Sequence, residues 1–164
     1  MVKKMYKVGD KIVYKRDVCK IDEIKENYAA NQDYYVLTPL FDTDLKIKIP
    51  TNNLNLRNLI TKKELEDIID EIPNIDLIIK DNREIEYEYK NLLSTYNIKD
   101  LIPIIKTTYL RNLEREKQKK KISDIDSTYF ELAEKYLYDE CSVVLDKTVE
   151  ETKEYFISKL KEVE

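Results

Sequence analysis

The stretch Tyr6-Lys-Val-Gly-Asp-Lys-Ile-Val-Tyr14 and its continuation Lys15-Arg-Asp-Val-Cys-Lys-Ile-Asp-Glu-Ile24 decide the fold of the N-terminal part of this chain. Gly9 is the only glycine in the protein, and with Asp10 it forms a turn signal directly before the apolar run at 12–14. Residues 18–24 alternate in part between apolar and charged side chains, as a half-buried strand does. The stretch therefore predicts two strands at the start of a small β-domain.

Three further apolar runs follow, separated by asparagines and aspartates that favour turns. Together they predict five strands, near 11–14, 18–27, 33–39, 45–50 and 56–58. The clearest alternation places Leu45, Ile47 and Ile49 on one face, with Lys46 and Lys48 on the exposed face. Five strands in about 50 residues suit a small SH3-like or Tudor-like β-barrel.

Beyond Pro50 the apolar period changes to that of helices. Thr61 and Glu64 form a capping box that opens a connecting helix, and Pro73 ends it. Apolar stripes then predict helices near 83–96, from Asp100 to the charged residues 115–121, from about 123–126 to 144, and from a second capping box at Thr148 onward. The expected fold class is α+β: a barrel at 1–60, a connecting helix and linker at 61–82, and a helical bundle at 83–164.

Composition argues against most enzyme classes. The chain of 164 residues has no histidine, no tryptophan and a single glycine, so it lacks the imidazole of a nucleophilic triad and the glycines of a phosphate-binding loop. Cys19 and Cys141 are too few for a zinc site, and both are expected to be reduced core residues. We therefore expect no enzyme activity, cofactor, metal or small-molecule substrate. A small carboxylate enzyme stays an alternative that a tightly bound ligand in purified protein would support.

No apolar run reaches the length of about 20 residues that spans a bilayer, and the N-terminus lacks the apolar core of a signal peptide. A soluble, cytoplasmic protein without membrane contact is expected. Residues 1–60 hold 11 basic and 8 acidic residues, a net charge of +3, whereas the rest holds 18 and 25, a net charge of −7. An acidic partner is therefore expected at the N-terminal part.

Several motifs occur in a familiar order: Gly9-Asp-Lys-Ile-Val-Tyr14, Val18-Cys-Lys-Ile21, Tyr34-Tyr-Val-Leu37 and Leu45-Lys-Ile-Lys-Ile-Pro50. With them the chain resembles the CarD/CdnL family of bacterial transcription regulators. The segments 105–110 and 133–145 look like the C-terminal helices of that family. The resemblance implies a barrel that docks on the β subunit of RNA polymerase and a helical domain that lies near promoter DNA.

The resemblance implies that polymerase is bound through a strand edge and basic side chains, here Lys25, Lys46 and Lys48. An exposed edge offers unpaired backbone groups to a partner strand, and lysines add charge complementarity. The alternative interpretation is that lysines on an edge strand only prevent aggregation.

A second candidate is a basic cluster at the end of a predicted helix. Its members are Arg111, Arg115, Lys117, Lys119, Lys120 and Lys121. Such a cluster can follow DNA phosphates without reading the base sequence, so we expect weak, non-specific contact with promoter DNA. The alternative is that these cations only complement the helix dipole.

A third feature is the absence of a tryptophan. The family is thought to wedge a tryptophan into promoter DNA from the segment that enters its first C-terminal helix, but residues 77–88 contain none. Ile78, Ile79 or Tyr87 could unstack a base step, although we expect the isoleucines to be core residues.

The leading hypothesis is a transcription regulator that modulates open-complex stability, and the alternative is a protein-interaction adaptor of the same fold without DNA contact.

Overall fold

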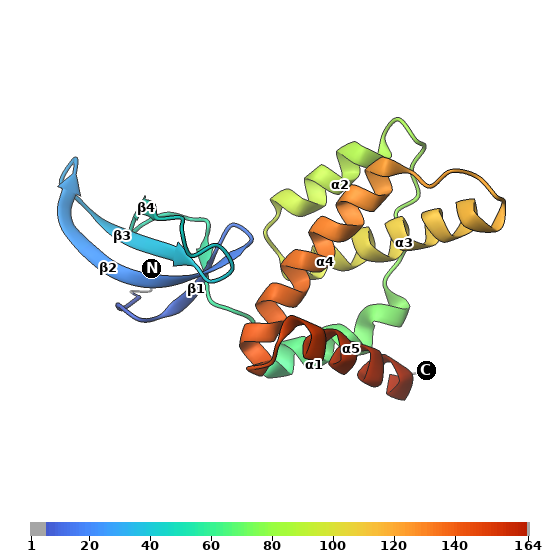
Figure 1. Cartoon of the computed structure of the whole chain (residues 1–164). Helices are drawn as coiled ribbons and strands as arrows, with labels where there is room; N and C mark the ends of the chain where they lie inside the picture. The colour runs from blue at the N-terminus through green and yellow to red at the C-terminus, as the bar shows by residue number, and fades with distance from the viewer. Residues whose placement is uncertain (1–5, 164) are drawn as a thin grey trace. The chain divides into compact units, whose positions relative to one another are not determined.

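The computed structural model describes residues 6–163, with side chains up to residue 160. The chain divides into two compact units, with the boundary between Leu59 and Ile60. The N-terminal unit holds a β-sheet and the C-terminal unit holds helices, so the α+β class expected from the sequence is confirmed. Figure 1 shows the elements of each unit.

The N-terminal unit is a five-stranded antiparallel sheet in the order β4-β3-β2-β1-β5. Figure 1 shows β2 and β3 as a long, curved hairpin. The order is linear, and no pairing between β4 and β5 occurs among the described residues, so the sheet is open and the predicted barrel closure is not observed. The strands are β1 (Lys11–Tyr14), β2 (Asp17–Ala29), β3 (Gln32–Pro39), β4 (Ile47–Pro50) and β5 (Leu56–Arg57).

One face of the sheet carries the core of this unit. Ile12, Cys19, Ile21 and Leu37 are fully buried there. The predicted inward position of Leu45 is wrong, because β4 begins only at Ile47 and the Leu45 side chain lies in the preceding turn, 46% exposed. The alternation predicted for this segment therefore applies to Ile47 and its successors alone.

The C-terminal unit contains five α-helices and two short 3-10 helices among the described residues. Helix α4 packs against both α3 and α5, and α1 also packs on α5. The helices are α1 (Lys62–Glu71), η1 (Ile72–Asn74), α2 (Ile85–Ser94), η2 (Ile98–Asp100), α3 (Leu101–Lys117), α4 (Asp124–Leu145) and α5 (Val149–Val163).

Local sequence signals set the ends of these helices. The predicted capping boxes at Thr61 and Thr148 are both present, each with reciprocal bonds to a glutamate three residues later. Ser123 caps α4 through its hydroxyl. By contrast, Asp100 makes no capping bond to α3; it instead accepts a hydrogen bond from Thr95 at 2.6 Å. The caps that could be predicted are those whose partners lie within one helical turn.

The core of the helical unit draws on every helix. Leu65, Tyr89, Leu101, Leu137 and Phe156 are among its buried members. Helix α1 supplies three buried residues to this core, so the predicted connecting helix packs with the bundle. As expected, the two cysteines are free and buried. No helix among the described residues is long and apolar enough to span a bilayer.

Candidate functional site

Two lysines meet over one tyrosine beside an edge of the sheet. The Lys25 Nζ lies 5.1 Å from the centre of the Tyr28 ring, and the Lys48 Nζ lies 5.3 Å from it. Lys48 also donates a hydrogen bond to the Tyr28 hydroxyl at 3.3 Å, and the Tyr34 ring packs 5.2 Å from that of Tyr28. We call Lys25, Tyr28, Tyr34 and Lys48 the Tyr28 cluster. It brings together two of the three lysines proposed for polymerase binding.

The register of the sheet and a bulge in β2 position this cluster. Lys25 is paired with Tyr34 across β2 and β3, and Lys48 lies on the neighbouring strand opposite Val36. The β2–β3 register shifts between Lys25 and the hairpin end, where Asn27 has a positive φ of 48°. A bulge redirects the side chains that follow it, and the Tyr28 side chain, 45% exposed, lies within this one.

The cluster carries free positive charge. Neither Lys25 nor Lys48 forms an ion pair with a carboxylate of the described residues. Cations held against a ring and without a partner remain available to an acidic ligand. The cluster therefore combines an exposed tyrosine, a residue type enriched in protein-binding hot spots, with unneutralised positive charge.

Lys46, the third predicted lysine, has a different environment. It forms an ion pair with Asp22 at 2.8 Å and donates to the Thr38 hydroxyl at 2.6 Å, and Thr38 also bonds Asp22. The hydrogen bond from Lys46 lowers the pKa of the Asp22 carboxyl, with a further contribution from Thr38. The Lys46 side chain is still 58% exposed. Its charge is thus partly neutralised by its own sheet, unlike the charges of the Tyr28 cluster.

Strand β4 is an edge of the sheet. Among the described strands it pairs only with β3; Lys48 lies on this edge strand, and Lys46 directly precedes it. An edge strand presents unpaired backbone donors and acceptors that a partner strand can satisfy. The structure therefore places an open edge and the Tyr28 cluster next to each other.

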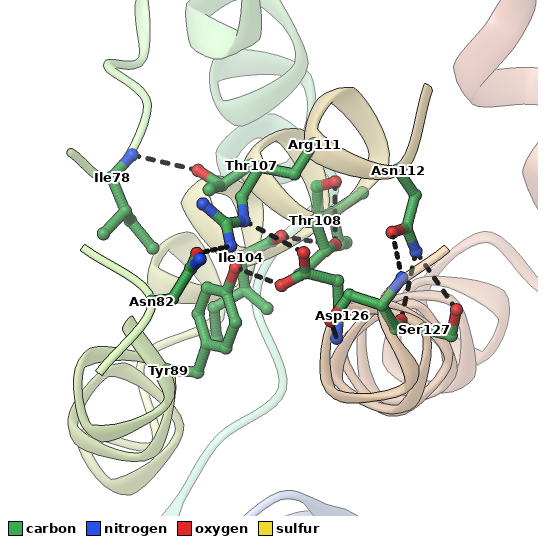
Figure 2. A network of polar contacts seen from close by, with 12 residues as sticks. Ile78, Asn82, Tyr89, Ile104, Thr107, Thr108, Arg111, Asn112, Asp126 and Ser127 are labelled. Carbon is green, nitrogen blue, oxygen red and sulfur yellow. Dashed lines mark hydrogen bonds and ion pairs between the residues drawn. The ribbon is translucent and has the colours of Figure 1, made fainter. Parts of the chain in front are cut away.

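The first arginine of the predicted DNA-binding cluster is held inside the helical unit. The Arg111 Nε lies 2.9 Å from Asp126, whose side chain is 1% exposed, and Nη2 donates to Asn82 at 2.7 Å. Tyr89 donates to the same carboxylate at 2.8 Å. Figure 2 shows the guanidinium between Asn82 and Asp126. Burial first, and then this bond, raise the pKa of Tyr89. Arg111 thus serves the interior of the unit.

The other predicted cations lie at the end of α3 and in the following turn. Lys117, Lys119, Lys120 and Lys121 are exposed, and Arg115 is half-buried. None of the five forms an ion pair with a described residue. Lys119 has a φ of 56°, and the amide of Lys120 donates back to the carbonyl of Arg115 at 2.8 Å, which is the geometry of a Schellman motif. The turn therefore fixes the backbone of the lysines.

The two adjacent isoleucines in the segment before α2 have different environments. Ile78 packs on the helical core, and its amide donates to Thr107 at 2.9 Å, whereas Ile79 is 91% exposed. The expectation that both isoleucines are core residues is therefore wrong for Ile79. Tyr87 on α2 is 68% exposed, and its acidic neighbours Glu86 and Glu88 on that helix are half-buried.

Two features of the surface escape the sequence patterns. Leu110, an apolar residue of α3, is 40% exposed, and the adjacent Tyr109 is 55% exposed with its ring 6.1 Å from that of Phe130. Only the mutual packing of α3 and α4 decides which part of a stripe is covered. No group of three or more metal-binding side chains occurs among the described residues.

Comparison with known proteins assigns the N-terminal unit. Residues 6–62 match the family model described as the CarD-like/TRCF RID domain. No curated protein matches the chain. The matched domain type indicates a transcription-related function that involves RNA polymerase. The helical unit lies outside the match, so its likeness to the C-terminal helices of the family stays an expectation. The match covers 57 of the 164 residues, and it shows that the N-terminal unit is CarD-like.

Proposed function

We propose that this chain is a non-enzymatic transcription regulator that binds the β subunit of RNA polymerase through its N-terminal unit and acts near promoter DNA through its helical unit. The observation that carries the proposal is the Tyr28 cluster beside the open edge of β4, inside a domain of the polymerase-interacting type. This surface combines unpaired backbone groups, to which a partner strand can add, with the unneutralised charges of two lysines.

In this proposal, a strand of the polymerase β subunit pairs with β4, and acidic side chains beside that strand meet Lys25 and Lys48. Main-chain hydrogen bonds supply affinity in strand addition, while flanking side chains supply specificity. Tyr28 adds a rigid aromatic contact, a residue type that dominates hot spots. Lys46 extends the basic edge, although its ion pair with Asp22 reduces its contribution to polymerase binding.

The DNA contact in this proposal comes from Arg115, Lys119, Lys120 and Lys121. They are unpaired and carried by a fixed turn, so they suit phosphates rather than bases. Arg111, which was expected among them, has its charge neutralised by Asp126 and contributes least. The contact is therefore weak and not sequence-specific.

Binding both polymerase and DNA gives a mechanism for regulation. A factor that binds the open promoter complex more tightly than the closed one shifts the population toward the open complex by that difference in affinity. Coupling free energies of about 1–3 kcal/mol, which change populations roughly 5-fold to 150-fold, are typical of such linkage.

A second candidate is a protein-interaction adaptor that does not contact DNA. The exposed Ile79 and Leu77 favour it, because they lie in an acidic segment with Asp76 and Asp81, and residues 61–164 carry a net charge of −7. Acidic and apolar surface opposes phosphates and suits a protein. The salt dependence of DNA binding separates the candidates, since phosphate contacts give a steep slope and an adaptor gives none.

The proposal is tested by measuring the affinity of the full chain for the isolated β-subunit lobe of a bacterial RNA polymerase. We expect the wild type to bind and the Lys25→Glu, Lys48→Glu double variant to lose binding. The matched control is the Lys11→Glu, Lys20→Glu variant, which makes the same charge change at two exposed lysines paired across β1 and β2. Equal loss in both variants would show a response to net charge and refute the assignment of the edge.

A further inference from the structure

A groove of about 250 Å³ lies between α3 and α4 of the helical unit, and both apolar and polar side chains line it. Tyr109 and Leu113 form the α3 side, Phe130 lies on α4, and Ile122 comes from the turn between the two helices. Pockets for drug-sized molecules measure about 300–1,000 Å³. This groove is smaller, so it suits one flat ring or one large side chain.

Two aromatic rings form a platform at this groove. The rings of Tyr109 and Phe130 are 6.1 Å apart and inclined by 31°, and Tyr109 is 55% exposed. A large, solvent-exposed tyrosine that packs on a second ring offers a stacking surface, and nucleobases stack on such surfaces whatever their identity.

Four lysines lie close in sequence to the groove. Ile122, which lines the groove, follows Lys119, Lys120 and Lys121 in the turn, and Lys117 is the last residue of α3. None of these lysines forms an ion pair with a described residue. An aromatic platform beside a row of unpaired lysines is the arrangement that binds single-stranded nucleic acid, with rings for bases and cations for phosphates.

The corner that carries these groups is held in place by Asn112. Its side chain accepts from the Ser123 amide at 2.8 Å and donates to the Ser127 hydroxyl at 3.1 Å. Figure 2 shows these bonds joining α3 to the start of α4. The groove is therefore preformed, and binding does not require the corner to be ordered first.

We propose that the groove between α3 and α4 binds one unpaired base of single-stranded DNA, stacked on Tyr109, while Lys119, Lys120 and Lys121 contact the flanking phosphates. The inference rests on the proposed function, because a melted promoter supplies unpaired strands. A base inside a duplex is stacked on its neighbours and cannot enter the groove, so the site distinguishes single strands from duplex.

Two carboxylates at the groove give it a base preference. Glu116 and Glu131 line it from α3 and α4. A carboxylate accepts hydrogen bonds from exocyclic amines, as it does from the amine of cytosine. Thymine has no such amine. Cytosine is therefore preferred to thymine, even though the carboxylates repel phosphates, and the Glu131→Gln variant reduces this preference.

The test measures fluorescence anisotropy of labelled oligonucleotides of about 12 nucleotides, a length within single-strand site sizes, with the full chain. The probes are oligo-dC, oligo-dT and a blunt duplex, and the variants are Tyr109→Ala, Tyr109→Phe and the control Tyr87→Ala. Tyr87 is a tyrosine on α2 that is 68% exposed, somewhat more than Tyr109. Circular dichroism checks that each variant is folded.

We expect oligo-dC to bind more tightly than oligo-dT and than duplex. Loss of one base stack costs roughly 5-fold to 150-fold in affinity, so Tyr109→Ala weakens oligo-dC binding by this factor, while Tyr109→Phe and Tyr87→Ala do not. Equal binding of duplex and single strands, or equal effects of Tyr109→Ala and Tyr87→Ala, overturns the inference.

The outcomes also separate this inference from the proposed function. Salt-dependent duplex binding without any effect of Tyr109→Ala refutes the groove and keeps the phosphate contact of the lysines. Groove-dependent binding of single strands without binding to the polymerase lobe keeps the groove and refutes the polymerase interface. Tighter binding of a peptide that alternates aspartate with phenylalanine than of oligo-dC would assign the groove to an acidic protein and overturn its assignment to DNA.

Discussion

Replacing Tyr89 by phenylalanine removes one buried hydroxyl and leaves the ring in place. Tyr89 is fully buried, and its hydroxyl donates to Asp126, whose side chain is 1% exposed and also binds Arg111. A hydrogen bond to a charged group contributes about 1.5–3 kcal/mol to stability. The substitution removes no carbon atom, so the loss of that bond dominates, and we expect the free energy of unfolding to fall by this amount.

The assay is urea unfolding followed by far-ultraviolet circular dichroism, which reports on the helical unit because all α-helices of the described residues belong to it. The matched control is Tyr87→Phe on the same helix, which removes a hydroxyl from a tyrosine that is 68% exposed. Surface changes of this kind stay within about 0.5 kcal/mol. The urea concentration at the unfolding midpoint should be lower for Tyr89→Phe, while the dependence of the unfolding free energy on urea concentration should stay unchanged.

A double-mutant cycle identifies the partner. In the Asp126→Asn background the hydroxyl meets a neutral acceptor, so Tyr89→Phe should cost only about 0.5–1.5 kcal/mol. A loss in Tyr89→Phe no larger than that in Tyr87→Phe would refute the reasoning. The same cost in both backgrounds would show that the contribution of the Tyr89 hydroxyl to stability does not depend on the charge of Asp126.

Three more outcomes are expected. Thr61→Ala removes the capping box of α1 and should cost about 0.5–2 kcal/mol of stability in urea unfolding, whereas Ser94→Ala, at an exposed helix end, should change it little. Burial raises the pKa of both Cys19 and Tyr138 to about 12. As the pH rises, the unfolded chain loses these two protons before the folded chain does, so the melting temperature should fall above about pH 8.5–10. A melting temperature that does not change over this alkaline range would contradict this. Burial also raises the pKa of the Cys141 thiol, so both thiols should react with a thiol reagent only on unfolding, and rapid labelling at neutral pH would disprove their burial.

The strands and helix caps could be predicted from the sequence because their signals are local. The Gly9 turn, the apolar run of β1 and the partial alternation of β2 need only neighbouring residues, and each capping box spans four positions. Leu45 shows the limit of such reasoning. Alternation does not tell where a strand begins, and the chain turns until Ile47.

The candidate site was less accessible to prediction because it depends on contacts distant in sequence. The lysines at 25 and 48 could be named, but their meeting over Tyr28 requires a bulge that no sequence signal marks. Arg111 looked like part of a basic cluster, yet its partner Asp126 lies on another helix. The exposure of Tyr109 likewise depends on how α3 and α4 pack.

The most direct test of the central claim is the lifetime of open promoter complexes formed by a bacterial RNA polymerase, measured with increasing amounts of this protein. We predict that the wild type changes the lifetime to a saturating value and that the Lys25→Glu, Lys48→Glu variant does not at the same concentrations. The Lys11→Glu, Lys20→Glu control should act like the wild type. An unchanged lifetime at saturating wild-type protein, or an equal effect of the Lys25→Glu, Lys48→Glu variant, would contradict regulation through the Tyr28 cluster.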